Sequence, residues 1–168
     1  MENLKVGGIF LVTCYDKYGN VLWYDKSKNL VVNTGLEHIL DLIFKLDNVI
    51  ANDDYYIGLI GASPVVVPSD TMTSHDGWEE NTKYVIDGDP LDRPKYKKTR
   101  TGLYVNNEAS RARFKLQETT ILGGAFLTSS NSDDTGLLLA ASSFENGDKL
   151  VNAGTFINVG YNFSISSV

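Results

Sequence analysis

Acidic residues gather at two places where their oxygens could bind a metal ion. In the first, Asp87, Asp89 and Asp92 surround Gly88, and carboxylates near a glycine are the ligands of calcium-binding loops. An EF-hand loop, however, ends on a glutamate, and here Pro90 interrupts the run. A solvated turn is therefore the interpretation that we favour over a calcium site.

The second place contains Asp70, His75, Asp76 and Glu79. Zinc sites usually take several His or Cys ligands. The chain has only two histidines and one cysteine, and neither histidine has a partner histidine at ligand spacing. We therefore expect His75 to be a hydrogen-bonded structural residue, and we expect no bound metal or cofactor.

Two further patterns suggest catalysis but have simpler interpretations. Residues 134–136 read D-T-G, the triplet in which aspartic proteases place paired carboxylates. A polar run precedes this triplet instead of an apolar strand, so a hairpin loop is the better interpretation. Cys14 lies in an apolar segment without a Cys-His-Asn arrangement, so we expect a buried, unreactive thiol. No catalytic residues are predicted, and we do not expect an enzyme.

Aromatic side chains offer a binding chemistry that needs no catalytic group. Trp23, Trp78 and the nine tyrosines could stack on sugar rings, although such side chains more commonly pack in cores or anchor interfaces. Trp78 lies in a long segment whose polar residues can hydrogen-bond across it. For this segment we predict a loop anchor formed by Asp70, Ser74, His75, Trp78 and Glu79.

Positive charge is concentrated in one short segment of an otherwise acidic protein. The formal net charge is −6, which argues against a general nucleic-acid binder. Five of the 15 Lys and Arg residues lie close together, and we call them the basic belt: Arg93, Lys95, Lys97, Lys98 and Arg100. The basic belt could contact phosphate. We favour salt bridges to the acidic surface of a neighbouring copy.

The length and composition limit the fold that presents these residues. A chain of 168 residues with 42% hydrophobic and 21% charged residues is typical of one globular domain. No apolar stretch approaches the roughly 20 residues that span a bilayer, and residues 1–5 lack the pattern of a secretory signal. We therefore predict one domain, residues 1–168, without a membrane partner.

Most of the chain has the pattern of β-strands. Apolar and β-branched residues recur in nine segments separated by turn residues: 6–15, 21–24, 29–32, 55–62, 104–105, 112–116, 121–127, 137–144 and 156–166. Residues 6–15 are apolar on both faces, which predicts cover by another sheet or by a partner subunit. The predicted fold is an all-β sandwich that resembles a jelly roll.

Two segments depart from the strand pattern. Thr34 and Glu37 match a capping box, which predicts a helix over about 35–47. Its apolar face is expected to contain Leu36, Ile39, Leu40 and Ile43, with Phe44 on the flank. Residues 63–100 contain all four prolines and no periodicity, which predicts a long irregular loop or arm.

Residues 70–80, which read D-T-M-T-S-H-D-G-W-E-E, are more distinctive than any of these patterns. With Tyr84 and the pair Arg93-Pro94, this block resembles a D-T-M-x-S-H-x-G-W-x-E motif of small structural proteins of tailed bacteriophages. Family-like segments also occur at 29–36, 57–60, 114–116, 121–127, 136–144 and 151–159, so the resemblance extends over nearly the whole chain. The interval between Tyr84 and Arg93 is wider than in the family, and Thr155 stands where the family has Asp.

The resemblance implies a virion protein, synthesised in the cytoplasm of a host bacterium. The expected role is that of a capsid cement or decoration protein, an oligomer such as a homotrimer that binds the major capsid protein or other virion proteins. The alternatives are a tail or baseplate module that binds a receptor or glycan through Trp78 and the tyrosines, and a tail or neck adaptor. In each case residues 63–100 could wrap around a neighbouring subunit.

Overall fold

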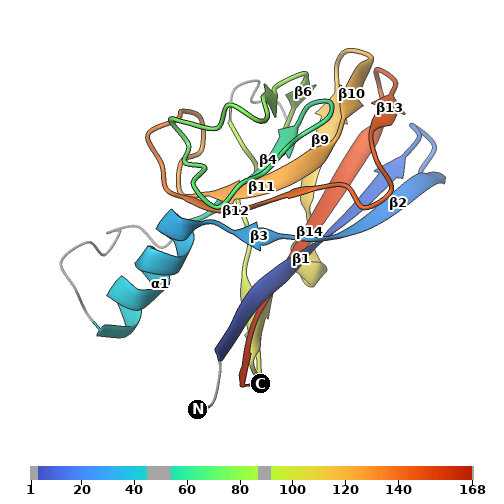
Figure 1. Cartoon of the computed structure of the whole chain (residues 1–168). Coiled ribbons are helices and arrows are strands. Elements are labelled where there is room, and N and C mark those ends of the chain that lie inside the picture. The colour runs from blue at the N-terminus through green and yellow to red at the C-terminus, as the bar shows by residue number, and fades with distance from the viewer. Residues whose placement is uncertain (1–3, 45–53, 87–91, 168) are drawn as a thin grey trace.

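The computed structural model describes residues 4–44, 54–86 and 92–167, which form two β-sheets packed face to face with one α-helix at their side (Figure 1). The centre of the first sheet is the antiparallel pair β1 (Leu4–Tyr15) and β14 (Phe156–Ser167), which run side by side over their whole lengths. The remaining strands of this sheet are β2 (Val21–Lys28), β6 (Tyr84–Val85), β7 (Thr99–Thr101), β8 (Tyr104–Asn106) and β9 (Ala112–Leu116). A short 3-10 helix, η1 (Glu108–Ser110), connects β8 to β9. The predicted all-β sandwich with one helix is confirmed.

The second sheet packs against the first and has five strands. Their order is β3 (Leu30–Val31), β12 (Leu138–Ser143), β11 (Gly124–Thr128), β4 (Tyr56–Ile60) and β5 (Glu80–Asn81). The strands β10 (Thr120–Leu122) and β13 (Lys149–Val151) form a separate pair. The prediction of a single strand over 121–127 is wrong, because the chain leaves one sheet and enters another at Gly123, where a Cβ atom would lie 2.5 Å from the Gly61 carbonyl oxygen.

The core lies between the two sheets, and alternation along β1 explains which side chains enter it. Phe10, Val12 and Cys14 point inward and are at most 1% exposed. Side chains from other strands complete this cluster: Phe114, Ile157, Val159, Tyr161, Ile57, Leu59, Ala125 and Leu127. Ile9 and Leu11 on the opposite face of β1 are only half-buried. The prediction that both faces of this strand are covered is therefore met for one face only within the described chain.

The helix α1 (Asn33–Phe44) lies beside the sandwich and differs from its prediction in two respects. It begins at Asn33, and the Thr34 hydroxyl donates a hydrogen bond to the Leu138 carbonyl at 2.9 Å. The expected capping box is therefore wrong, because a partner from β12 engages this hydroxyl. The predicted apolar face is largely exposed: Leu36, Leu40 and Ile43 are 40%, 52% and 56% exposed, and only Ile39 is half-buried. Residues 45–47 of the predicted helix lie outside the described residues.

The segment predicted as an irregular loop is irregular only in part. Residues 80–101 contain the short strands β5, β6 and β7. Residues 61–79, which we call the covering loop, contain no helix or strand and lie across the outer face of the second sheet (Figure 1).

The strands β1 and β14 continue beyond the sandwich and stay paired as far as Leu4 and Ser167 (Figure 1). We call this extension the ribbon: residues 4–9, residues 162–167 and the hairpin of β7 and β8. Within the described residues, no helix has the length and apolar character needed to cross a lipid bilayer.

Candidate functional site

The covering loop is fixed to the second sheet by an aromatic cluster. Trp78 and Met72, which are 4% and 3% exposed, pack with Phe126 and Ile60 on the side of the sheet that faces away from the main core. The Trp78 and Phe126 rings lie 5.2 Å apart. The Phe126 ring in turn occupies the space above Gly58, where a Cβ atom would lie 2.1 Å from the ring. The loop therefore acts as a third layer over β11 and β4.

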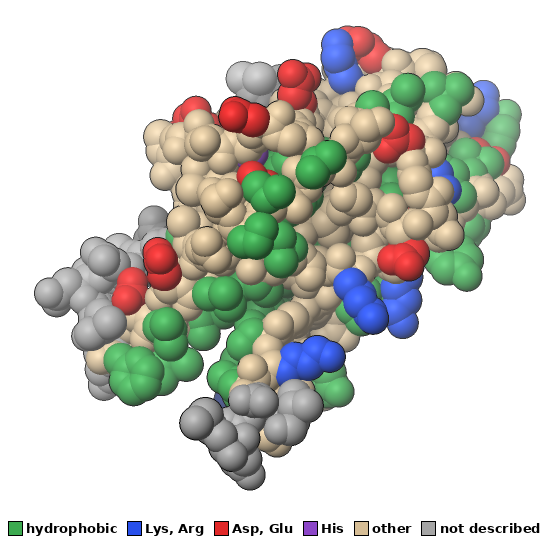
Figure 2. Space-filling view, in the orientation of Figure 1, with side chains coloured by type: hydrophobic (Ala, Val, Ile, Leu, Met, Phe, Trp, Pro, Cys, Tyr) green, Lys and Arg blue, Asp and Glu red, His purple; other side chains and the backbone are tan. Residues whose placement is uncertain are grey.

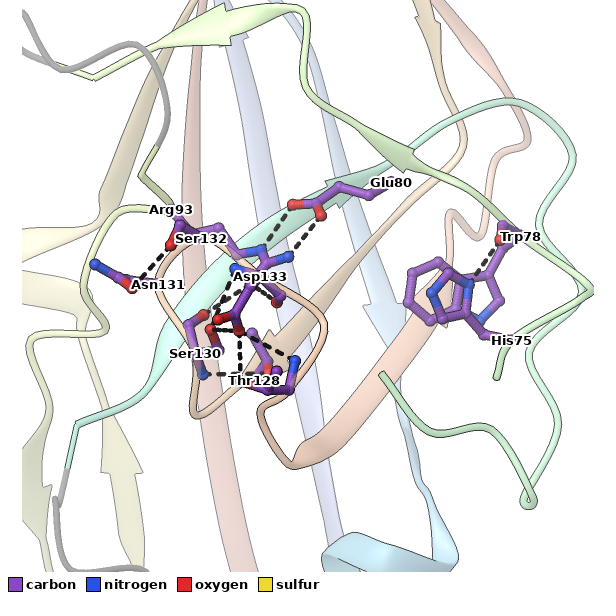
Figure 3. Close-up of polar contacts among 10 residues, drawn as sticks. His75, Trp78, Glu80, Arg93, Thr128, Ser130, Asn131, Ser132 and Asp133 are labelled. Carbon is purple, nitrogen blue, oxygen red and sulfur yellow. Dashed lines mark hydrogen bonds and ion pairs between the residues drawn. The ribbon is translucent and has the colours of Figure 1, made fainter. Parts of the chain in front are cut away.

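Polar contacts fix the Trp78 ring within this layer. Its Nε1–H donates to the Asp70 carboxylate at 3.0 Å, and the Val67 N–H donates to the same oxygen at 3.0 Å. The His75 ring stacks on the indole with centroids 3.8 Å apart, as Figure 3 shows. The His75 Nδ1 lies 2.8 Å from the Trp78 carbonyl oxygen, and because a carbonyl only accepts, this nitrogen donates.

Three of the five predicted anchor residues are thus brought together, and two are not. Asp70 and His75 both contact Trp78, whereas the side chains of Ser74 and Glu79 are exposed. These two residues act through their backbones: the Ser74 N–H donates to the Thr71 hydroxyl, and the Glu79 carbonyl accepts from the Gly61 N–H.

This geometry has two consequences for the functions considered above. The buried Trp78 ring is not available to stack on a sugar, so a glycan platform at this residue is wrong. Asp70 and His75 direct polar atoms at Trp78 instead of at a common point, and the described residues contain no group of three His, Cys, Asp or Glu residues placed to share a metal ion. Asp87 and Asp89 of the possible calcium loop lie outside the described residues.

Arg93, predicted as part of an exposed basic belt, is instead a buried clamp. Its Nε and Nη2 atoms donate to the two carboxylate oxygens of Glu80, each at 2.7 Å, and the Arg93 side chain is only 4% exposed. Its Nη1 donates to the carbonyls of Ser130 and Asp133 at 2.8 and 2.9 Å (Figure 3). The backbone N–H of Arg93 donates to the Asn131 carbonyl. Burial alone would lower the pKa of Arg93, but the hydrogen bonds and charge of Glu80 outweigh it and raise this pKa.

The same loop explains the D-T-G triplet. Asp133, one residue earlier, accepts hydrogen bonds from the Ser130 hydroxyl and from the N–H and hydroxyl of Thr135. These bonds lower the pKa of the Asp133 carboxyl and close a turn between β11 and β12. Asp134 is exposed in this turn, so the prediction of a hairpin loop is confirmed.

The other four members of the basic belt are exposed, but three of them have partners within the chain. The Lys95 ammonium group lies 2.7 Å from the Asp54 carboxylate, and the Lys98 ammonium group lies 5.4 Å from the centre of the Tyr55 ring. Arg100 donates to the Gly102 carbonyl at 3.2 Å, and Lys97 is exposed. The belt of five outward-pointing cations is therefore wrong, because Arg93 points inward.

The structure shows a different basic surface, whose cations come from segments that are far apart in the sequence. Residues paired across the first sheet share one outward face. We call it the basic face, because it carries Lys5, Lys26, Lys28, Arg113 and Lys115. Asp and Glu are absent from the outward positions of the described strands of this sheet. Alternate cations at 26 and 28 and at 113 and 115 were the signal in the sequence. In Figure 2, blue side chains gather around β1 and β2.

The second surface that differs from its prediction is the apolar face of α1, which was expected to be buried. Leu36, Leu40, Ile43 and Phe44 share this face and are each between 40% and 68% exposed. The buried residues of the helix are Gly35 and His38, and at Gly35 a Cβ atom would lie 2.3 Å from the Leu139 carbonyl oxygen. The helix is thus attached by a glycine and a histidine, and its large apolar side chains point away from the sandwich.

Cys14 is buried, as predicted, and burial raises the pKa of its thiol to about 11. Such a thiol stays protonated at neutral pH and is a poor nucleophile.

Trp23 is partly buried and packs against Phe144 with ring centres 5.8 Å apart.

Comparisons of this chain with protein-family models, with curated proteins and with solved structures found no match. The functional interpretation therefore depends on the geometry of the covering loop, the basic face and the exposed helix.

Proposed function

We propose that this protein is a non-enzymatic structural component of a phage virion, a capsid cement or decoration protein that assembles into an oligomer and binds the shell. The oligomer is inferred from the exposed apolar face of α1. The assignment to a virion depends on the sequence resemblance centred on residues 70–80.

The apolar face of α1 favours a protein partner over solvent. Burying one large aliphatic side chain completely contributes about 1.5–3 kcal/mol, and this face leaves four large apolar side chains exposed: Leu36, Leu40, Ile43 and Phe44. Exposed apolar groups gathered in one place mark interaction surfaces, whereas single ones carry no such meaning.

A hollow separates α1 from the ribbon, and hydrophobic side chains line it on both sides in Figure 2. On the ribbon, Val6 pairs with Ile165, and Phe163 lies two residues from Ile165 on the same face. All three side chains are only partly buried. The apolar face of the helix thus continues onto the ribbon and offers a larger surface than the helix alone.

A second copy of the chain is the partner that fits this surface. Leu36, Leu40 and Ile43 follow the spacing i, i+4, i+7, which lets equivalent helices pack against one another around a symmetry axis. A symmetric contact of this kind gives a closed oligomer such as the expected trimer. The basic face of the first sheet and the covering loop then remain available for the shell.

Light scattering coupled to size-exclusion chromatography tests the oligomer. The parent should elute with a mass of about three times the 18.5 kDa of the chain, and at least as a multiple of it. The double variant Leu40→Asp, Ile43→Asp should elute as a monomer, because it places charge in an apolar contact. The matched control is Val65→Asp on the covering loop, which alters a residue that is 62% exposed and should leave the mass unchanged. A parent that is monomeric at micromolar concentration contradicts the oligomer.

The place in the virion needs a separate measurement. Quantitative mass spectrometry of purified phage particles should give a copy number comparable to that of the major capsid protein. A copy number comparable to that of tail or neck proteins would instead favour the tail module or the adaptor.

A further inference from the structure

The outward face of the first sheet contains a hollow of about 350 Å³ in the ribbon. Its floor is open because Gly7 has no side chain, and nothing lies within 4 Å of the position where its Cβ atom would be. The side chains around this floor come from four strands or their ends: Lys5, Lys28, Tyr104, Asn162 and Ser164.

The strand register explains why these side chains meet. Gly7 lies opposite Ser164, and Ser164 lies opposite Tyr104 on the next strand. Ile9, two residues from Gly7, lies opposite both Lys28 and Asn162. Residues directly opposite each other in an antiparallel sheet share a face, so the hollow is a consequence of the pairing itself.

The hollow combines three kinds of recognition chemistry. Lys5 and Lys28 are exposed cations, and its lining contains no Asp or Glu. The Ser164 side chain supplies a hydroxyl, and the Oδ1 atom of Asn162 is buried without a hydrogen-bond partner among the described residues. Tyr104 is 53% exposed and supplies an aromatic side chain to the lining.

We propose that this hollow binds a carboxylated sugar residue, of the chemical class of the hexuronic acids. The two ammonium groups select the carboxylate, the Ser164 hydroxyl pairs with a sugar hydroxyl, and the Tyr104 ring packs on the apolar face of the pyranose. The volume lies within the range of small-molecule sites, roughly 300–1,000 Å³, and exceeds what an inorganic anion fills. This site is separate from the buried Trp78 and does not depend on the proposed assembly through α1.

Titration of the ¹⁵N-labelled protein with D-glucuronate, followed by amide chemical shifts, tests this site. We expect a dissociation constant on the order of 1 mM, as is common for a single small ligand in an open site, with shifts at Gly7, Ser164 and the Asn162 side-chain amide. D-glucose should bind roughly tenfold more weakly, because it lacks the carboxylate. Inorganic phosphate should also bind more weakly, because it does not fill the hollow.

Two variants locate the binding. Gly7→Val fills the floor, and because its Cβ meets open space in a β-strand, it should fold normally and abolish the shifts. Its matched control, Thr13→Val, alters the same face of β1 outside the hollow and should bind like the parent. Lys5→Gln with Lys28→Gln should weaken binding by about tenfold or more, whereas Lys26→Gln on the same face should not.

Three results would overturn the proposal. Equal binding of glucose would show that the lysines select nothing, and equal binding of phosphate would reduce the hollow to a simple anion site. Unchanged glucuronate binding in a folded Gly7→Val variant would place the ligand elsewhere.

Discussion

Trp78 joins the covering loop to the second sheet through both its ring and its Nε1–H. Its replacement by alanine should reduce the free energy of unfolding by about 3–5 kcal/mol, the usual range for a large buried aromatic side chain. Trp78→Phe should cost less, because it keeps a ring against Phe126 and loses chiefly the hydrogen bond to Asp70. Urea denaturation measures both changes.

The control for Trp78 is Tyr24→Ala, which removes an aromatic ring that is 73% exposed and should cost less than about 1 kcal/mol. If Trp78→Ala unfolds at the same urea concentration as the parent, the covering loop is not anchored by this residue.

Arg93 holds two segments together that are far apart in the sequence, β5 and the loop between β11 and β12. Arg93→Ala should cost about 3–5 kcal/mol, because it leaves the Glu80 carboxylate and two carbonyl groups without their partner in a poorly solvated place. Arg93→Lys should retain only part of this stability, since an ammonium group cannot reproduce the planar, forked geometry of the guanidinium group.

Thermal unfolding of the Arg93 variants beside Lys97→Ala, an exposed neighbour in the same segment, measures this difference. Equal melting temperatures for Arg93→Ala and Lys97→Ala would contradict a structural role of the clamp.

At the scale of single elements, the attachment of α1 should depend on pH through His38. Burial lowers the pKa of His38 below its ordinary value of 6.5, partly offset by Asp41, while the Nε2 atom lies 2.8 Å from the Tyr55 hydroxyl. The unfolded chain then binds this proton more readily than the folded chain, so stability is lost as the pH falls through 6.5 toward the lower folded value. His38→Gln removes the titration and keeps a hydrogen-bonding side chain.

The measurement is the melting temperature at about pH 7.5 and about pH 5.5 for the parent and for His38→Gln. The parent should lose more stability than the variant over this interval. A variant with the same pH dependence as the parent would show that His38 does not contribute.

The sequence predicted the elements better than it predicted their surroundings. An uninterrupted apolar run predicted β1, and alternation predicted β14, because successive side chains of a strand point to opposite faces and a half-buried strand is apolar at every second position. Periodicity also predicted α1, but an amphipathic pattern does not state which surface covers the apolar face. Leu40 and Ile43 were therefore assigned to the core, although they are exposed.

The candidate site shows the same limit. Asp70, His75 and Trp78 lie within nine residues of one another, so their contact could be predicted locally. Arg93 was assigned to a surface belt because its neighbours are lysines, whereas its real partners, Glu80 and residues 130–133, come from distant segments. Whether a charged side chain is buried depends on partners from distant segments. The density of charge along the chain does not reveal these partners.

At the scale of the whole molecule, assembly can be attributed to either of two surfaces, the apolar face of α1 or the basic belt. Contacts through these two surfaces respond to salt in opposite ways. Exposed ion pairs weaken as the Debye length falls from about 10 Å at 0.1 M salt to about 3 Å at 1 M. Apolar contacts do not weaken in this way, and higher salt also screens the repulsion between copies that each carry a net charge of −6.

If α1 drives assembly, the oligomer should persist or strengthen when sodium chloride is raised from about 0.1 to about 1 M, as measured by light scattering. The charge-reversed variant Lys95→Glu, Lys97→Glu, Lys98→Glu should then form the same oligomer, because Lys95 and Lys98 already contact Asp54 and Tyr55 within their own chain. Its circular dichroism serves as the control for folding. Dissociation of the parent at high salt, together with a monomeric charge-reversed variant, would assign assembly to the basic belt and contradict the role of α1.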